Sequence, residues 1–234
     1  MGFEAIVLAG GLGTRLRSIV VDRPKVMLEI GSRPFLEILL ERMIPRGLHR
    51  AILATSHMHP IIESYFGTQF RGVKIDYARE DQPLGTGGAV WNALQTASEE
   101  DVLVLNGDTL FDIDLYDFHR FHKEIRADAS IALKPMRNFD RYGTVELTNG
   151  RIKAFREKRP TKEALINGGV YLLNRASITK LVMPERFSIE TDFFEKYTTR
   201  LRICGYVSDA YFIDIGIPED CERARRELGR DISK

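Results

Sequence analysis

The pattern of apolar and polar residues predicts strands and helices in turn through the first half of the chain. Four short runs are typical of buried strands: 5–9, 51–54, 73–78 and 102–105. Three segments between them have helical character: 34–47, 60–66 and 88–97. The first of these begins with Pro34, expected at the first helical position, and ends near Gly47. Alternating strands and helices predict an α/β fold with a mostly parallel sheet.

The second half of the chain mixes the two periodicities. Helices are predicted over three segments: 115–124, 190–199 and a final one that begins at Pro218. Strands are predicted over four segments: 129–133, 166–173, 201–207 and 211–213. Asn149-Gly150 lies between two short strand patterns and indicates a hairpin. No linker or repeat divides the chain, so one domain spanning 1–234 is expected.

Composition narrows the class of protein. With 44% hydrophobic residues, the 234-residue chain can bury a sizeable core, and its net charge of +1 gives no support for a nucleic-acid or membrane partner. Two cysteines, Cys204 and Cys221, are too few for a disulfide scaffold. The N-terminal residues do not fit a signal peptide or a myristoylation site, and no apolar run is long enough to span a bilayer. We therefore expect a cytoplasmic protein.

The first strand is followed by a glycine-rich stretch, GGLGTRLR, and then by Lys25 behind Pro24. Glycines allow the backbone to approach a large anion, and fixed cations neutralise its charge. An ordinary strand-to-helix turn with surface arginines is also consistent with this sequence. The P-loop pattern is absent, and the Rossmann fingerprint fails because Leu16 stands where its last glycine belongs. If the loop binds phosphate, it does so in another way.

Two aspartates follow apolar strands and adjoin glycines. Asp108 belongs to Asn106-Gly107-Asp108, after the strand at 102–105, and Asp214 follows the strand at 211–213. Ligands of open parallel sheets bind beyond the carboxyl ends of the strands. Each aspartate alone is more typical of a turn or a helix cap. Together they favour a Mg²⁺ ion that bridges phosphates, because Mg²⁺ takes few protein oxygens and keeps positions for substrate and water.

The combined motifs resemble those of the sugar-1-phosphate nucleotidyltransferases, whose G-x-G-T-R-L loop precedes a Pro-Lys pair. In order along this chain the motifs are LAGGLGTRL, RPKVML, EDQPLGTGGA, LNGDTL, YGTVE, FREK, INGGVYLL, IETDFF and FIDIGIPEDCERA. They cover nearly the whole sequence. Within the family, VVDRPKVM and PFLE are most similar to the enzymes that attach GMP to D-glycero-D-manno-heptose 1-phosphate.

The resemblance implies a fold, a reaction and a metal. The fold is a three-layer, Rossmann-like α/β nucleotidyltransferase fold, in which helices flank a mostly parallel mixed sheet. It has a nucleotide-binding part at roughly 1–115 and a sugar-phosphate-binding part at roughly 116–234. The reaction joins an NTP, with GTP favoured, to a sugar 1-phosphate, and it releases pyrophosphate and an NDP-sugar for surface glycan synthesis. Arg15 and Lys25 would be catalytic through contacts with the phosphates, and Asp108 and Asp214 would hold Mg²⁺.

The family's motifs also imply two groups of binding residues. The nucleotide-binding group is Leu8, Ala9, Gly10, Gly11, Gly13, Thr14, Arg15, Glu80, Gly85 and Thr86. The sugar-phosphate-binding group is Asn106, Tyr142, Gly143, Glu157, Lys158, Asn167, Gly168 and Asp192. The Glu80 carboxylate would accept hydrogen bonds from guanine, and a side chain at position 85 would crowd the base. Asp192 is also a candidate helix cap.

Three alternatives stay open at this point. The first is the same reaction on mannose 1-phosphate or another sugar phosphate, with UTP, CTP or dTTP. Asp112 and Asp114 form a D-x-D pattern found in metal-dependent glycosyltransferases, but that reading leaves the GTRL loop without a purpose. A non-catalytic NDP-sugar-binding regulator would not need Arg15 and Lys25. Because many members of the family are multimers, we expect a homodimer.

Overall fold

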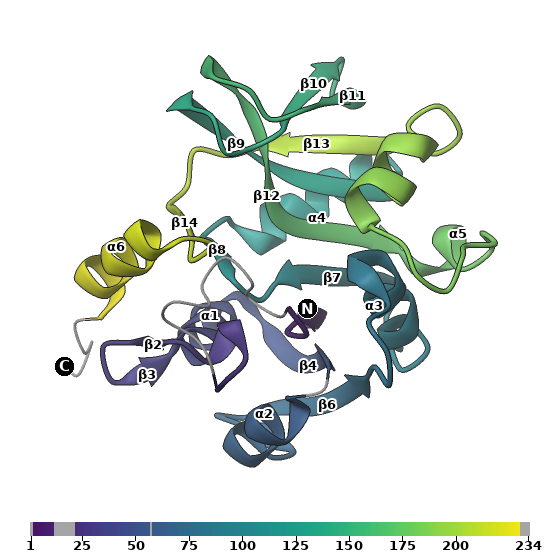
Figure 1. The fold of residues 1–234 in the computed structure, drawn as a ribbon. Helices are drawn as coiled ribbons and strands as arrows, with labels where there is room; N and C mark the ends of the chain where they lie inside the picture. The colour runs from purple at the N-terminus through teal and green to yellow at the C-terminus, as the bar shows by residue number, and fades with distance from the viewer. Residues whose placement is uncertain (1, 12–21, 57, 230–234) are drawn as a thin grey trace.

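A computed structural model describes residues 2–11, 22–56 and 58–229, and a single large sheet runs through it (Figure 1). The strands lie in the order β10 (Thr144–Thr148), β11 (Arg151–Arg156), β13 (Ile203–Val207), β9 (Ala129–Phe139), β12 (Thr161–Asn174), β7 (Asp101–Asn106), β1 (Phe3–Leu8), β4 (Leu48–Thr55), β6 (Val73–Arg79) and β5 (Gln69–Phe70). The sheet therefore joins strands of the first half of the chain to strands of the second.

The parallel character expected of the sheet is confined mainly to the first half. Strands β7, β1, β4 and β6 pair in parallel, and so do β13 and β9. Strand β12 is antiparallel to both β7 and β9, and β10 to β11. The sheet is thus mixed, as the family resemblance implied, and its second half holds more antiparallel pairings than expected. Two-residue hairpins such as Asn149-Gly150 can join only antiparallel strands, whereas parallel strands need a longer crossover.

Helices cover both faces of the sheet, which confirms the three-layer α/β arrangement. Ala5 and Val7 of β1 belong to the core formed with α1 (Phe35–Met43), α2 (His59–Phe66), α4 (Leu115–Glu124) and α6 (Pro218–Leu228). Ile6 belongs to the other core, with α3 (Gly85–Leu94), α5 (Arg175–Ile178) and the π-helix η4 (Ile189–Glu195). The central strands read as continuous apolar runs because side chains alternate between two buried faces.

Several predicted boundaries shift in the structure. Pro34 lies at the N-cap position of α1, one residue before the first helical position that was predicted for it. The helix ends at Met43, before a short 3₁₀ turn, η3 (Ile44–Arg46). Helix α3 begins three residues before the predicted start, at Gly85. The predicted hairpin forms, with positive φ angles of 52° at Asn149 and 75° at Gly150. Pro218 opens α6 as predicted.

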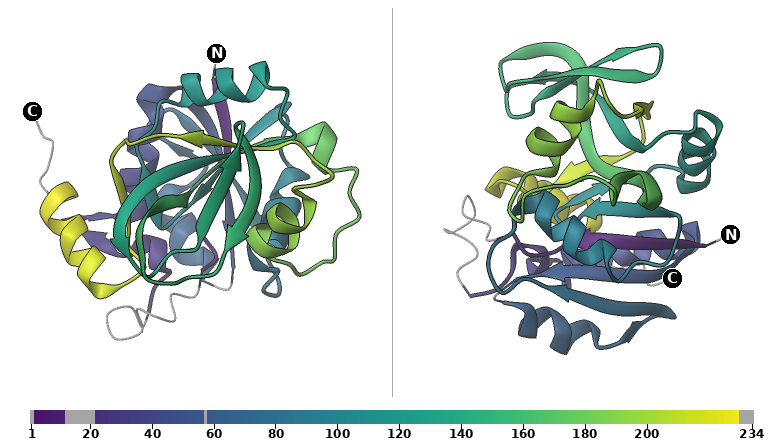
Figure 2. Two further views of the ribbon diagram at one scale, coloured as in Figure 1. Left: turned by 90° about the horizontal axis from the view of Figure 1, so that it is seen from above. Right: turned by 90° about the vertical axis from the view of Figure 1, so that its right-hand side faces the viewer.

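Short elements near the ends of the central strands were not predicted. They are η2 (Lys25–Met27), the pair β2 (Glu29–Ile30) and β3 (Arg33–Pro34), and β8 (Thr109–Phe111), which pairs with β14 (Phe212–Asp214). The right-hand view of Figure 2 shows β9–β12 standing above the parallel strands, with η4 beside α3. Among the helices of the described ranges, none is long and apolar enough to cross a membrane.

Candidate active site

The carboxyl ends of β1, β4 and β7 lie side by side because their register is continuous. Leu8 pairs with both Ala54 and Asn106, and the amide of Gly107 donates to the Leu8 carbonyl at 3.0 Å. A Cβ at position 107 would lie 2.4 Å from that carbonyl oxygen, so only glycine fits this approach. The sequence thus places the loops after β1 and β7 against each other.

A cavity of about 330 Å³ opens at this edge. Its lining includes Leu8, Gly10, Gly11, Lys25, Glu80, Gly85, Thr86, Asn106 and Asp108. Most of these residues were predicted to bind the nucleotide, and Asn106 was predicted on the sugar side. Ala9 lines a small neighbouring pocket. Gly13, Thr14 and Arg15 lie outside the described residues. We refer to this space as the first cavity.

Glu80 enters the first cavity from the turn after β6. Its amide donates to the carbonyl of Thr55 at 2.9 Å, and its Oε2 accepts from the amide of Leu84 at 3.0 Å. The first bond fixes the backbone of Glu80, and the second holds its carboxylate. Burial raises the pKa of Glu80 and the Leu84 amide opposes the rise. The arrangement leaves a half-buried acceptor at the wall of the cavity.

Lys25 and Asp108 form an ion pair in the first cavity, with Nζ of the lysine 2.5 Å from Oδ2 of the aspartate. Lys25 begins η2 directly after Pro24, which holds an extended conformation. The lysine side chain is 12% exposed. A half-buried cation therefore reaches the end of β7.

Asp214 reaches the same place through strand pairing. β14 pairs with β8 so that Asp214 faces Thr109, and the amide of Ile215 donates to the Asp108 carbonyl at 3.0 Å. Burial raises the pKa of Asp214 and the negative charge of Asp108 adds to the rise, while Lys25 lowers it. The two carboxylates predicted to hold metal are thus brought together by a pairing of strands that was not predicted.

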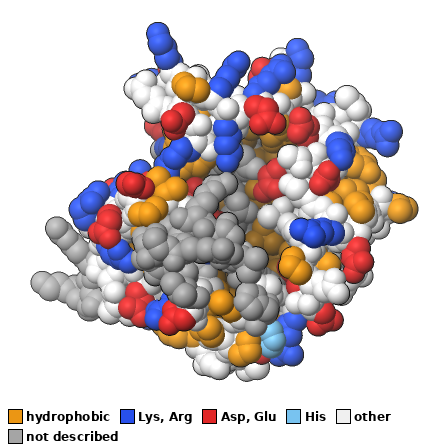
Figure 3. Space-filling view, in the orientation of Figure 1, with side chains coloured by type: hydrophobic (Ala, Val, Ile, Leu, Met, Phe, Trp, Pro, Cys, Tyr) orange, Lys and Arg blue, Asp and Glu red, His pale blue; other side chains and the backbone are white. Residues whose placement is uncertain are grey.

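A second cavity, of about 380 Å³, lies on the other side of Asp214. Its lining includes the predicted sugar-side residues Tyr142, Gly143, Glu157, Lys158 and Asn167, together with Asp214. The hydroxyl of Tyr142 donates to Oδ2 of Asp214 at 3.3 Å. Arg141 and Arg156 also line it, and Figure 3 shows basic side chains over the upper part of the molecule, which β9–β12 form.

The remaining predicted sugar-side residues have structural contacts. Gly168 is buried in β12, where a Cβ would lie 2.3 Å from the ring of Phe111. Asp192 accepts from the amide of Ser188 at 2.9 Å and from Nζ of Lys196 at 2.7 Å. Asp192 does not line the second cavity among the described residues, and these bonds match the capping alternative.

The aspartates of the D-x-D pattern are engaged elsewhere. Oδ1 of Asp112 lies 2.7 Å from a guanidinium nitrogen of Arg46. Oδ1 of Asp114 accepts from the amides of Tyr116 and Asp117 and so caps α4. Within the described ranges, no group of three or more His, Cys, Asp or Glu residues could hold a metal ion. The pattern is therefore explained by structure, without a metal.

Sequence reasoning missed Glu190, which lines the second cavity and accepts from the hydroxyl of Thr86 at 2.8 Å. Both residues lie inside quoted motifs, LGTGGA and IETDFF, but nothing in either motif shows that the two meet. The expectation for Gly85 also changes. A Cβ there would lie 2.6 Å from the carbonyl oxygen of Phe187, so the described neighbour that it crowds is the segment before η4.

Comparison with known proteins agrees with this geometry. The family described as Nucleotidyl transferase matches residues 4–230. The chain belongs to this family. The match confirms the resemblance to sugar-1-phosphate nucleotidyltransferases drawn from the motifs, and the chain is therefore an enzyme.

Individual relatives cover the chain almost completely. It is 47% identical over 225 residues to D-glycero-alpha-D-manno-heptose 1-phosphate guanylyltransferase of Aneurinibacillus thermoaerophilus, covering 96% of this chain and 98% of the relative. It is 44% identical over 218 residues to the enzyme of the same name from Campylobacter jejuni, covering 93% and 96%. HddC of Yersinia pseudotuberculosis, solved in complex with GMP-PN, superposes with a TM-score of 0.86 at 34% identity, covering 97% of this chain and 99% of HddC.

Proposed function

We propose that this enzyme transfers GMP from GTP to D-glycero-α-D-manno-heptose 1-phosphate, releasing pyrophosphate and GDP-heptose for surface glycan synthesis. The observation that carries the proposal is the 47% identity to a heptose 1-phosphate guanylyltransferase along nearly the full length of both chains. A mannose-1-phosphate guanylyltransferase of Mycobacterium tuberculosis is 35% identical, and the match covers 66% of that protein. Heptose 1-phosphate is therefore the favoured acceptor, and mannose 1-phosphate is the alternative to test.

The first cavity supports the choice of GTP through Glu80. A carboxylate held by the Leu84 amide presents an acceptor that can receive both the N1–H and the exocyclic amine of guanine. Uracil lacks this pair of adjacent donors. The glycines at positions 10 and 11 leave the backbone open to the triphosphate, and Lys25 supplies a fixed cation in the same cavity. Arg15 is proposed as a second phosphate contact by family resemblance.

The aspartate pair fits a Mg²⁺ ion. Burial raises the pKa of Asp214, the nearby charge of Asp108 adds to the rise, and Lys25 opposes it, so the two carboxylates lie close to each other. Two carboxylates suit an ion that takes its other ligands from water and phosphate oxygens. When bound, Mg²⁺ would neutralise charge that develops on the phosphates. A divalent metal is in keeping with the family, and Asp108 and Asp214 are the residues proposed to hold it.

The second cavity supports sugar-phosphate binding. Lys158 and Arg156 provide positive charge for the phosphate, while Glu157 and Asn167 provide acceptors for hydroxyls. Because Asp214 lines this cavity and Asp108 lines the first, the sugar phosphate and the nucleotide would meet at the aspartate pair. This supports dividing the chain into a nucleotide-binding part at roughly 1–115 and a sugar-phosphate-binding part at roughly 116–234.

The reaction needs alignment of two anions rather than an activated side chain. The sugar-phosphate oxygen is already ionised at neutral pH, and it attacks the α-phosphorus of GTP as pyrophosphate leaves. Lys25, in the lining of the first cavity beside Asp108, would neutralise charge that grows on the α-phosphate. The half-buried setting of Lys25 strengthens this interaction, because less water screens it.

A substrate matrix tests the proposed function. Four NTPs are each combined with heptose 1-phosphate, mannose 1-phosphate and glucose 1-phosphate, with and without Mg²⁺, and pyrophosphate release is measured. We expect the highest kcat/KM with GTP and heptose 1-phosphate. A higher value for any other pair would overturn the substrate assignment, and turnover of an NDP-sugar without pyrophosphate would overturn the reaction. A cytoplasmic location and a homodimer are further expectations, and light scattering of the purified protein measures the second.

A further inference from the structure

The two cavities share a side-chain bridge. The hydroxyl of Thr86 donates to Oε2 of Glu190 at 2.8 Å, across 104 positions of sequence. Thr86 belongs to the first turn of α3 and lines the first cavity, whereas Glu190 belongs to η4 and lines the second. A single hydrogen bond therefore joins the wall of the proposed nucleotide site to the wall of the proposed sugar site.

The bridge is part of a tightly bonded junction between α3 and η4. The hydroxyl of Ser188 donates to the same Oε2 of Glu190 at 2.8 Å, and the amide of Ile189 donates to Oγ1 of Thr86 at 3.0 Å. The Thr86 hydroxyl thus acts as donor and acceptor toward η4. Its side chain is committed to this junction, which leaves the backbone of Thr86 to contact a nucleotide.

Backbone hydrogen bonds and ring packing also hold α3 and η4 together. The amide of Gly87 donates to the carbonyl of Phe187 at 2.9 Å, and the amide of Phe187 donates to the carbonyl of Leu84 at 3.0 Å. The ring of Trp91 on α3 packs edge-on against Phe187 and Phe193. Both views in Figure 2 show η4 next to α3. Because these contacts hold η4 in place, the Glu190 carboxylate has a defined direction.

One oxygen of Glu190 is left for a ligand. No described residue donates a hydrogen bond to its Oε1, although Oε2 receives two. A carboxylate oxygen with no protein donor at a cavity wall satisfies its bonding capacity with water or with a ligand donor. Sugar hydroxyls are such donors.

We infer that Glu190 is a specificity-determining residue for the sugar phosphate: Oε1 accepts a hydrogen bond from a sugar hydroxyl while Thr86 holds Oε2. This inference rests on the proposed function, because it takes a sugar phosphate as the ligand of the second cavity. It has an unusual consequence. Removing the Thr86 hydroxyl, in the wall of the nucleotide cavity, weakens recognition of the sugar.

Substitutions at the two residues test this consequence. Glu190→Gln keeps an acceptor for Thr86 through its amide oxygen but turns an NH₂ group toward the cavity. It should raise the KM for the sugar phosphate about tenfold, the effect of losing one hydrogen bond to a charged group, and leave the KM for GTP nearly unchanged. Thr86→Val should raise the sugar-phosphate KM by a similar factor. Thr86→Ser, which keeps the hydroxyl, should have a sugar-phosphate KM close to that of the wild-type enzyme.

A double-substitution cycle separates the bridge from two independent effects. If the hydroxyl acts through Glu190, the combined variant Thr86→Val/Glu190→Ala should be no worse than Glu190→Ala alone. Multiplication of the two single effects would overturn the inference. Glu185→Gln is the matched control, because it removes the same charge from the exposed segment just before η4 and Glu185 lines neither cavity. An equal loss in Glu185→Gln would also overturn the inference.

The identity of the sugar does not decide the outcome. The variants are compared with whichever sugar phosphate the wild-type enzyme uses best, so a different preferred sugar corrects the proposed function and leaves this test intact. Conversely, a wild-type enzyme that favours GTP and heptose 1-phosphate, with an unchanged sugar-phosphate KM in Glu190→Gln, would support the proposed function and reject the role of Glu190.

Discussion

Lys25 and Asp108 contact each other although 83 positions separate them in sequence, with 2.5 Å between Nζ and Oδ2. The other carboxylate oxygen, Oδ1, accepts from the hydroxyl of Thr109 at 3.2 Å. The cation proposed to contact phosphate is therefore held by a carboxylate proposed to bind metal. Each residue places the other at the edge of the sheet where the first cavity opens.

Replacing Lys25 with alanine should lower kcat by about a hundredfold or more, because it removes a charge contact that strengthens in the transition state. The KM for GTP should change much less. Pyrophosphate release under saturating substrates measures the effect. Lys74→Ala is the control, since Lys74 is 63% exposed and lies on β6 beside Asp76. Wild-type turnover by Lys25→Ala would show that the ion pair has only a structural role.

Asp108→Asn should remove most activity and the response to Mg²⁺, because an amide is a much weaker metal ligand than a carboxylate. Electron paramagnetic resonance with Mn²⁺ measures metal binding directly, apart from turnover. Asp112→Asn is the matched control: it alters the rival D-x-D pattern, whose first aspartate pairs with Arg46. Normal metal binding in Asp108→Asn, or its loss in Asp112→Asn, would show that the ligands are assigned wrongly.

The raised pKa of Asp214 predicts opposite effects on activity and stability. Since the folded-state pKa lies above the usual 3.8, the folded protein takes up the proton first as the pH falls. This group therefore stabilises the fold at low pH, and the contribution is lost as the pH rises through the folded-state pKa. Asp214→Asn should be inactive yet more stable than wild type at neutral pH.

Thermal unfolding without metal, over a pH series, measures this difference. The advantage of Asp214→Asn should shrink as the pH is lowered, because protonation then neutralises the wild-type carboxylate as well. The hydrogen bond from Tyr142 is available to either side chain. A variant less stable than wild type at neutral pH would mean that the charge of Asp214 is better compensated than the neighbouring carboxylate suggests.

Local pattern was enough to predict most of the fold. The apolar runs of β1, β4, β6 and β7 indicated buried strands because both faces of these strands are covered by helices. Apart from the β10–β11 hairpin, the antiparallel pairings of the sheet were not predicted, since a period of two does not show which strand is the neighbour. Strand β12 runs from Thr161 to Asn174, and it pairs with both β7 and β9. That pairing joins the two halves.

The residue types at the ends of the strands were enough to predict which residues form the candidate site. They did not predict the contacts that hold these residues together. Asp108 and Asp214 were expected near each other because both follow strands, yet their contact depends on the short pair β8 and β14. A strand was predicted at 211–213, where β14 lies, but the three residues of β8 are too few to show a period, so its partner was not predicted. The bond between Thr86 and Glu190 was not predictable for a related reason, since long-range side-chain contacts depend on packing.

Gly85→Ala should destabilise the protein more than the same change at another glycine of positive φ. Gly85 has φ of +74°, and a Cβ would lie 2.6 Å from the Phe187 carbonyl oxygen. Gly150 has φ of +75°, almost the same as Gly85, with no atom within 4 Å of its Cβ position, so Gly150→Ala reports backbone strain alone. The clash should lower the free energy of unfolding of Gly85→Ala by about 1–3 kcal/mol more than in the control variant. Urea unfolding of both variants measures this, and equal losses would mean that the segment before η4 yields freely.

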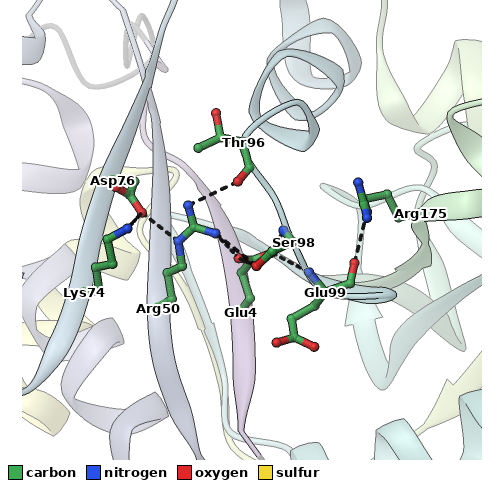
Figure 4. Close-up of polar contacts among 8 residues, drawn as sticks. All are labelled: Glu4, Arg50, Lys74, Asp76, Thr96, Ser98, Glu99 and Arg175. Atoms are coloured by element: carbon green, nitrogen blue, oxygen red, sulfur yellow. Dashed lines mark hydrogen bonds and ion pairs between the residues drawn. The ribbon is translucent and has the colours of Figure 1, made fainter.

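Glu4 and Arg50 form a buried ion pair on the far side of the sheet from the candidate site. Removing it should lower the stability of the protein and leave its activity unchanged. Figure 4 shows Glu4 of β1 in contact with Arg50 and Ser98. The Glu4 carboxylate also accepts from the amides of Ser98 at 2.8 Å and Glu99 at 3.2 Å. Burial alone would raise the pKa of Glu4, but these amides, the Ser98 hydroxyl and Arg50 together lower it.

Glu4→Ala should cost about 3–5 kcal/mol, because it leaves the Arg50 guanidinium partly buried with one carboxylate partner removed. Glu99→Gln is the control, since Glu99 contributes only its backbone amide and carbonyl to the network in Figure 4. The lowered pKa sets a further condition: the stabilisation from Glu4 is present above the usual 4.5 and is lost as the pH falls through its folded-state pKa. The gap between wild type and Glu4→Ala in urea unfolding should therefore narrow in acid. A gap that stays constant with pH would mean that packing, not the carboxylate's charge, gives Glu4 its effect on stability.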